Sequence, residues 1–470
     1  MNRTIQLQHT LSALNKKNFQ NFIIQEMGFT LNGKLDDEIR HKAYLEFRKR
    51  TCRTNFAAVT TVKRWFGISG CSKPTRAVMF HIGFVLKLDK KEMDHYFEEG
   101  LQEPSFVISD YHEMVFLYGI ENHESYETCL NMIERIEQNL NCLYTTSKTR
   151  NTNELLKQFE REKHVSPEEF VLWMLDRIEW FKGYSHTAFH YLNQLKIQII
   201  ENARKEELKK LEQILSETPY EKWAAKQKKE KAYSKESIQR FLDKKDTNGV
   251  YYVSENMKQC ILELIQIIFS EKYSNRKLLE ELVQTYLDDS EKEVSAEIKK
   301  IISEKNLSYL FRAPEQAEKC IQARQAMARL EKMEEEEKCP DDIKKFLDSC
   351  GVPETETDKV KTAKYECENL QKQLNCAVLL PGRNELLPLI HMITLQNYYL
   401  SDWDISQNVD AKKEFVDFAN AVLTTCNLEP INEKYEIDSL LLAGFTEAGI
   451  YSYADLLYLR KMTEEEDGIR

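Results

Sequence analysis

The chain has 470 residues, a net charge of −11 and 42% hydrophobic residues, a composition typical of a folded protein with two to four domains. Glycine (14 residues) and proline (10 residues) are scarce, which favours long helices and argues against a glycine-rich nucleotide-binding enzyme. No run reaches the ~18 apolar residues of a membrane span, and residues 1–8 lack the apolar core of a secretion signal. We therefore expect an all-α cytoplasmic protein without a membrane partner.

The first hundred residues predict several short helices. Acidic residues at 36–38 favour a helix start, and an apolar stripe follows from Ile39 to Phe47. A second helix is expected from near Thr60 to Phe66, ending at Gly67, and residues 68–74 form a turn because glycine and proline interrupt the pattern. The apolar segment 75–86 predicts a third helix, and Asp89 caps a fourth that extends to Phe97.

Helices continue over 111–118 and 126–140, and the polar stretch 145–153 is the best linker candidate. Ser166-Pro167-Glu168-Glu169 is a capping box that opens another helix, and a longer amphipathic helix is expected over 187–215. The lysine-rich segment 219–248 indicates an exposed helix or a hinge, and helical patterns resume over 257–286 and 360–374, separated by a loop at 351–357. We expect three domains: a helix-turn-helix-like domain over 1–103, a helical domain over 104–218 and a C-terminal helical domain over 219–470.

The C-terminal segment 437–459 is rich in aliphatic and aromatic residues. Burial in a core is the preferred interpretation, and a groove or dimer face for a partner is the alternative. Through these C-terminal helices we expect a homo-oligomer or a protein partner.

Catalytic and metal-binding signatures are absent from the sequence. The eleven cysteines include no C-x-x-C pair, so they are expected to be reduced and to pack as small apolar residues. Phosphate-binding glycine motifs and the G-x-S-x-G motif do not occur. His186 and His190 have the spacing of a zinc pair but no third ligand. We expect no cofactor, no metal and no enzymatic activity.

Charge is distributed unevenly along the chain. Residues 47–88 contain nine Lys and Arg residues and no acidic residue, whereas residues 89–137 contain thirteen acidic and three basic residues. A local positive field on an acidic protein suits an acidic polymer such as double-stranded DNA. The alternative is that these cations pair with the acidic stretch and hold two helical layers together.

Residues 60–67 (TTVKRWFG), Lys73-Pro74-Thr75, the apolar segment 78–88 and the acidic cap Asp89 together resemble one family. They are similar to the second half of a phage-repressor-type (Xre-like) helix-turn-helix domain, over roughly residues 44–100. The resemblance implies that the helix near residues 60–65 is a recognition helix, followed by the fourth and fifth helices of that fold. The family usually has a glycine in the turn before the recognition helix, and residues 53–58 contain none.

Side-chain spacing gives the same expectation. Thr60, Thr61 and Arg64 share one helix face, with Lys63 beside it, whereas Val62, Trp65 and Phe66 point inward. Arg64 is suited to guanine, and the neighbouring cations are suited to phosphates. The candidate DNA-binding residues are Arg48, Lys49, Arg50, Arg53, Thr60, Thr61, Lys63, Arg64, Lys73 and Arg76.

The leading hypothesis is a sequence-specific DNA-binding transcription regulator whose helical body serves sensing or oligomerisation. The alternative is a helical protein–protein interaction or scaffold protein that keeps a helix-turn-helix-like fold without binding DNA. An enzyme of an unrecognised helical class is a third, less favoured hypothesis.

Overall fold

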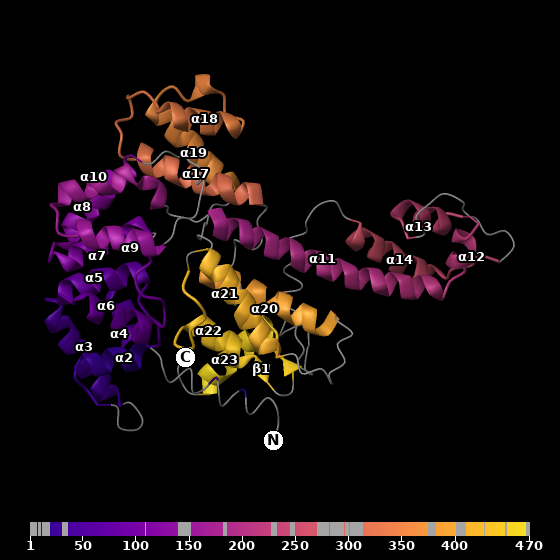
Figure 1. Ribbon diagram of the computed structural model, residues 1–470, viewed down its shortest axis with the longest axis horizontal. Helices are drawn as coiled ribbons and strands as arrows, with labels where there is room; N and C mark the ends of the chain where they lie inside the picture. Colours follow the sequence, from indigo (N-terminus) through magenta and orange to yellow (C-terminus); the bar gives the residue numbers. More distant parts are fainter. Residues whose placement is uncertain are drawn as a thin grey trace.

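The computed structural model is built from helices, as the composition predicted (Figure 1). It describes residues 7, 11, 19–30, 36–108, 110–139, 152–181, 186–226, 233–244, 250–269, 282, 296, 300, 314–374, 382–400, 410–426, 428–446 and 449–466. Within these residues one pair of short antiparallel strands occurs, β1 (Phe445–Thr446) and β2 (Gly449–Ile450). None of the described helices has both the length and the apolar composition needed to cross a membrane.

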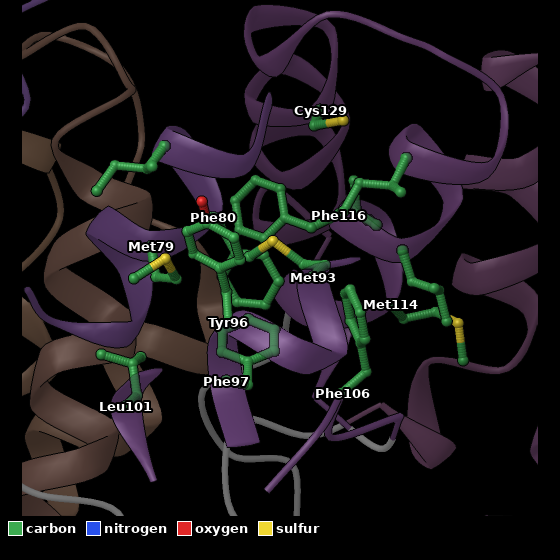
Figure 2. Close-up of a cluster of buried hydrophobic side chains, with 14 of the residues drawn as sticks. Met79, Phe80, Met93, Tyr96, Phe97, Leu101, Phe106, Met114, Phe116 and Cys129 are labelled. Atoms are coloured by element: carbon green, nitrogen blue, oxygen red, sulfur yellow. The ribbon is translucent and has the colours of Figure 1, made fainter. Parts of the chain in front are cut away.

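The amino-terminal domain is a set of short helices around one aromatic core. Its elements are α2 (Phe19–Glu26), α3 (Asp37–Arg50), α4 (Val59–Trp65), α5 (Arg76–Leu86), α6 (Lys90–His95), the π-helical segment η1 (Tyr96–Leu101), α7 (Tyr111–Glu121), α8 (Tyr126–Glu137), α9 (Thr152–Glu162), α10 (Pro167–Asp176) and the 3₁₀ turn η2 (Ile178–Trp180). Figure 2 shows part of the core, where Phe80 of α5 stacks on Phe116 of α7 with ring centroids 4.7 Å apart.

The predicted helix starts in this domain are confirmed. The Asp36 side chain accepts a hydrogen bond from the Glu38 backbone N–H at the start of α3. Asp89 and Ser166 each form a capping box with the acidic residue three positions later. These side chains satisfy backbone N–H groups that have no partner inside the helix, which is why the sequence signal is reliable.

The expected boundary at residue 103 is not a break in the packing. A single cluster of buried side chains runs from Phe19 to Phe181, and Tyr118 of α7 stacks on Phe170 of α10 at 4.1 Å. The helices over residues 44–100 therefore share a core with those that follow them. Residues 145–151 of the predicted linker lie outside the described residues. Its last two residues belong to α9, which begins at Thr152.

Helix α11 (His186–Ser216) links two separate cores. Its first half packs with α20 (Arg383–Leu400), α21 (Ala411–Thr425), α22 (Glu436–Ala443) and α23 (Tyr453–Glu466). In this C-terminal domain Leu441 and Leu456 are fully buried, and most of the apolar side chains of 437–459 are buried with them. The preferred interpretation of that segment as core is confirmed.

The second half of α11 carries a small lobe at its far end, formed with α12 (Tyr220–Ala224), α13 (Lys235–Leu242) and α14 (Glu255–Ile268). The segment 219–248, predicted to be an exposed helix or hinge, supplies two helices of this lobe. Another lobe contains α17 (Pro314–Leu330), α18 (Asp341–Ser349), the 3₁₀ turn η4 (Glu354–Glu356) and α19 (Val360–Leu374). Figure 1 shows α11 extending away from the other domains, with α12–α14 at its end.

Candidate nucleic-acid interface

Helix α4 is held in the amino-terminal domain by one apolar face. Val62, Trp65 and Phe66 are each at most 1% exposed. The Phe47 ring of α3 lies 6.5 Å from Trp65 and 5.5 Å from Phe66, measured between ring centroids. The predicted inward orientation of these three side chains is confirmed, and it fixes which face of α4 is turned to solvent.

The opposite face of α4 is polar and basic. Thr60 and Arg64 are exposed, and Thr61 and Lys63 are half-buried. The Lys63 ammonium lies 6.0 Å from the centre of the Tyr44 ring, a distance at which a cation–π contact is weak. Within the described residues neither Lys63 nor Arg64 forms a salt bridge. In the part of the chain that the structure describes, no carboxylate therefore neutralises their charges.

The end of α4 is shaped by Gly67, as the sequence predicted. Gly67 has φ +72°, the left-handed conformation that glycine adopts without cost, and its N–H donates to the Arg64 carbonyl. Arg40 of α3 donates from Nη1 to the Gly67 carbonyl at 2.7 Å. Local sequence spacing does not reveal this role of Arg40, because 27 residues separate donor and acceptor.

The connection from α3 to α4 replaces the expected glycine with two strained residues. Cys52 (φ 49°) and Arg53 (φ 60°) are both left-handed. Arg53 N–H donates to the Arg48 carbonyl and Cys52 N–H to that of Lys49, the Schellman pattern that ends a helix. The connection covers residues 51–58, longer than the 3–4 residues of a helix-turn-helix turn.

Arg48 and Arg50, two of the residues predicted to bind phosphates, form hydrogen bonds within this region. Arg48 donates to the carbonyls of Thr54 at 2.6 Å and Arg53 at 2.9 Å, which holds the strained turn in place. Arg50 donates to the Glu46 carboxylate at 2.9 Å and to the carbonyls of Glu26, the last residue of α2, and Met27, which follows it. Lys49 and Arg53 have exposed side chains.

Lys73 and Arg76 are also used inside the protein. Arg76 donates to both carboxylate oxygens of Glu113, at 2.6 and 2.8 Å, and to the carbonyls of Pro104 and Ser105. Its guanidinium carbon lies 4.1 Å from the centre of the Phe97 ring. For Arg76 the alternative interpretation holds, because it pairs with Glu113, which belongs to the stretch 89–137. Lys73 lies 3.7 Å from Glu103 of that stretch, but its shorter ion pair, at 2.6 Å, is with Glu436 of the C-terminal domain.

The predicted site is thus divided into two groups. Arg48, Arg50, Lys73 and Arg76 have internal partners, whereas the remaining six residues have side chains that reach solvent on α4 or near the end of α3: Lys49, Arg53, Thr60, Thr61, Lys63 and Arg64. The two helices meet through Phe47, so the second group surrounds one buried contact.

No family model, curated protein or solved structure matches this chain.

Proposed function

We propose that the amino-terminal domain binds double-stranded DNA through the solvent face of α4, and that the chain is a cytoplasmic, sequence-specific transcription regulator. The observation that carries this proposal is the pairing of a fully buried apolar face with an exposed Thr60/Arg64 face. A recognition helix requires this division, because one side anchors it and the other contacts base edges.

In this proposal Arg64 recognises a base and the surrounding cations bind phosphates. A guanidinium can bind guanine O6 and N7 bidentately, and within the described residues no carboxylate forms a salt bridge with Arg64. Lys63, Lys49 and Arg53 supply positive charge for the backbone. The C-terminal helices then serve a partner or a second copy of the chain.

A helical interaction protein is the second candidate. It is favoured by the long 51–58 connection and by the internal use of Arg48, Arg50, Lys73 and Arg76. In that case the exposed face of α4 binds an acidic protein surface.

Fluorescence anisotropy on labelled duplex DNA tests the proposal. With about six phosphate contacts, the logarithm of the binding constant falls against the logarithm of salt concentration with a slope of about −5. Lys63→Ala/Arg64→Ala is expected to abolish submicromolar binding and to reduce the slope by about 0.9 for each lost phosphate contact.

Lys91→Ala/Arg135→Ala is the matched control, because it removes the same charge from two exposed positions of the same domain. Binding that is absent in about 150 mM salt, or that falls equally in both double variants, contradicts DNA recognition by α4 and supports the interaction protein.

A further inference from the structure

The lobe at the end of α11 has a core of its own. Leu211 and Leu215 of α11 pack there with Tyr220, Ile238 and Ile261 from the three helices that follow. A helix of 31 residues is about 46 Å long, and Figure 1 shows this lobe at the far end of α11 from α20–α23. The lobe therefore presents a surface that is remote from the C-terminal domain.

Two lysines converge on one aromatic ring in this lobe. The Lys244 ammonium lies 4.0 Å from the centre of the Tyr251 ring, and the Lys226 ammonium lies 5.6 Å from it. Lys226 Nζ also donates to the Tyr251 hydroxyl at 2.9 Å. Lys226 follows α12 and Lys244 follows α13, so two separate segments bring like charges to the same tyrosine.

No carboxylate among the described residues neutralises this pair: neither Lys226 nor Lys244 forms a salt bridge there. The surrounding sequence adds to the charge, because residues 226–245 contain eight Lys and Arg residues against three acidic ones. Cation–π attraction to Tyr251 offsets part of the repulsion between the two ammonium groups. A bound anion would offset the remaining repulsion.

An exposed aromatic residue follows Tyr251 in the chain. Tyr252 is 72% exposed, and Val250 on the other side of Tyr251 is 61% exposed. Burial of large aromatic side chains is favourable, and Tyr252, the sequence neighbour of the ring that both lysines contact, is left in solvent with a flat face open to a planar ligand. Positive charge that follows a phosphate backbone, combined with aromatic faces for bases, is the pattern by which proteins bind single-stranded nucleic acid.

We propose that this surface, which we call the tip (Lys226, Lys244, Tyr251 and Tyr252), binds single-stranded nucleic acid. The two ammonium groups bind backbone phosphates, and Tyr252 stacks on a base. Because any base has a π-face, recognition at the tip is largely independent of sequence. The tip shares no residue with α4, and its proposed ligand is a different one. The proposal for the tip is therefore independent of whether α4 recognises duplex DNA.

The experiment measures anisotropy of a labelled single-stranded DNA of mixed sequence and of the matching duplex, with the full chain. We expect Lys226→Ala/Lys244→Ala to weaken single-strand binding about tenfold or more through loss of phosphate contacts. Tyr252→Ala is expected to weaken it by roughly 5- to 150-fold through loss of stacking, whereas Tyr252→Phe retains most of the affinity. Because Tyr252 is exposed, its substitution is expected to leave the fold of the lobe intact.

Lys205→Ala/Lys209→Ala is the matched control, because it removes two exposed charges from the shaft of α11. Wild-type chain that fails to bind the single strand overturns the proposal, as does equal loss in the shaft control. Loss only in Lys63→Ala/Arg64→Ala assigns single-strand binding to α4 instead. Displacement by poly-glutamate with no effect of Tyr252→Ala identifies an acidic protein as the ligand and also overturns it.

Discussion

The Glu436 carboxylate lies 2.6 Å from the Lys73 ammonium, although 363 residues separate the two in the sequence. Glu436 also pairs with Arg460 at 2.8 Å, and its backbone N–H donates to the Gln102 carbonyl. Nearby, Lys434 lies 3.1 Å from Glu99. These contacts join the start of α22 to the amino-terminal domain.

Glu436→Gln is expected to loosen this contact. Lys73 and Glu436 are 39% and 24% exposed, so the pair contributes less than about 1 kcal/mol, and hydrogen exchange near Leu101–Glu103 is expected to rise by roughly threefold. Hydrogen-exchange mass spectrometry measures this. Glu38→Gln, which removes the Lys42–Glu38 pair within α3, is the control. Unchanged exchange in Glu436→Gln would show that the Lys73–Glu436 pair does not contribute measurably to this contact.

Arg76→Ala is expected to lower the free energy of unfolding of the amino-terminal domain by about 3–5 kcal/mol, because it leaves the buried Glu113 carboxylate without its partner. Chemical denaturation followed by tryptophan fluorescence measures the loss. Arg76→Met/Glu113→Gln removes both charges and keeps an acceptor for the Val107 N–H that Glu113 now binds. This double variant is expected to recover about half of the loss or more, and no recovery would contradict the ion-pair explanation.

His112 makes stability depend on pH. Partial burial lowers the pKa of His112, but hydrogen bonds to the Asp110 and Glu137 carboxylates outweigh it and raise the pKa to about 9. The protonated ring is thus favoured in the folded state, so the stabilisation is complete below pH ~6.5 and is lost as pH rises through about 9. With the side chain 42% exposed, the effect stays below about 1 kcal/mol.

Denaturation midpoints at pH 6 and pH 9.5 for wild type and His112→Gln test this, and the difference between the two proteins is expected to disappear at the higher pH. A constant difference would show that His112 acts by packing. Glu137 also binds Lys332 of the α17–α19 lobe at 2.9 Å, so the same titration is expected to affect the contact between this lobe and α8.

His391 has the opposite pH dependence. It is fully buried between Phe415 and Phe445, and within the described residues neither ring nitrogen has a hydrogen-bond partner. Burial lowers its pKa to about 3. The unfolded chain takes up a proton below pH ~6.5, so stability falls by about 1.4 kcal/mol for each pH unit from there toward pH 3.

His391→Leu is expected to remove this acid sensitivity and to equal or exceed wild type in stability at pH 7, because an apolar residue has no unsatisfied polar atoms to bury. Thermal unfolding at pH 5 and pH 7 measures both effects. Equal acid sensitivity in the variant would assign the loss to other groups.

Cys52→Gly is expected to stabilise the amino-terminal domain by about 1 kcal/mol, since glycine adopts the left-handed conformation at the end of α3 without steric cost. Lys49→Gly, in the last turn of α3, is expected to destabilise it by roughly 0.5–1 kcal/mol. Opposite signs of the change in melting temperature confirm the local strain. Loss of stability in both variants would contradict it.

Local structure was largely predictable from the sequence, because caps and apolar spacing act within a few residues. Gly67 follows the end of α4, and Asp89 and Ser166 cap the starts of α6 and α10. The buried positions of α4 followed from the helical spacing of its apolar residues. Chain-wide composition predicted the all-α fold in the same way, since few residues break helices.

Long-range pairing was less predictable. The acidic stretch that binds Arg76 was visible as an alternative, but which carboxylate lies beside which cation depends on how α5 and α7 pack. Lys73 pairs with Glu436 across most of the chain, and local spacing carries no information about such a partner. The packing of Phe80 against Phe116 across residue 103 is of the same long-range kind.

Helix α11 contributes side chains to two cores and connects them mechanically. One end is embedded among α20–α23 and the other carries the tip lobe. The part of α11 beyond Ile200, the last of its residues in the C-terminal core, is about 24 Å long. For an arm of this length, a tilt of about 5° at the embedded end is expected to displace the far end by about 2 Å. Repacking in the C-terminal domain is therefore expected to move Tyr252 and its neighbouring lysines.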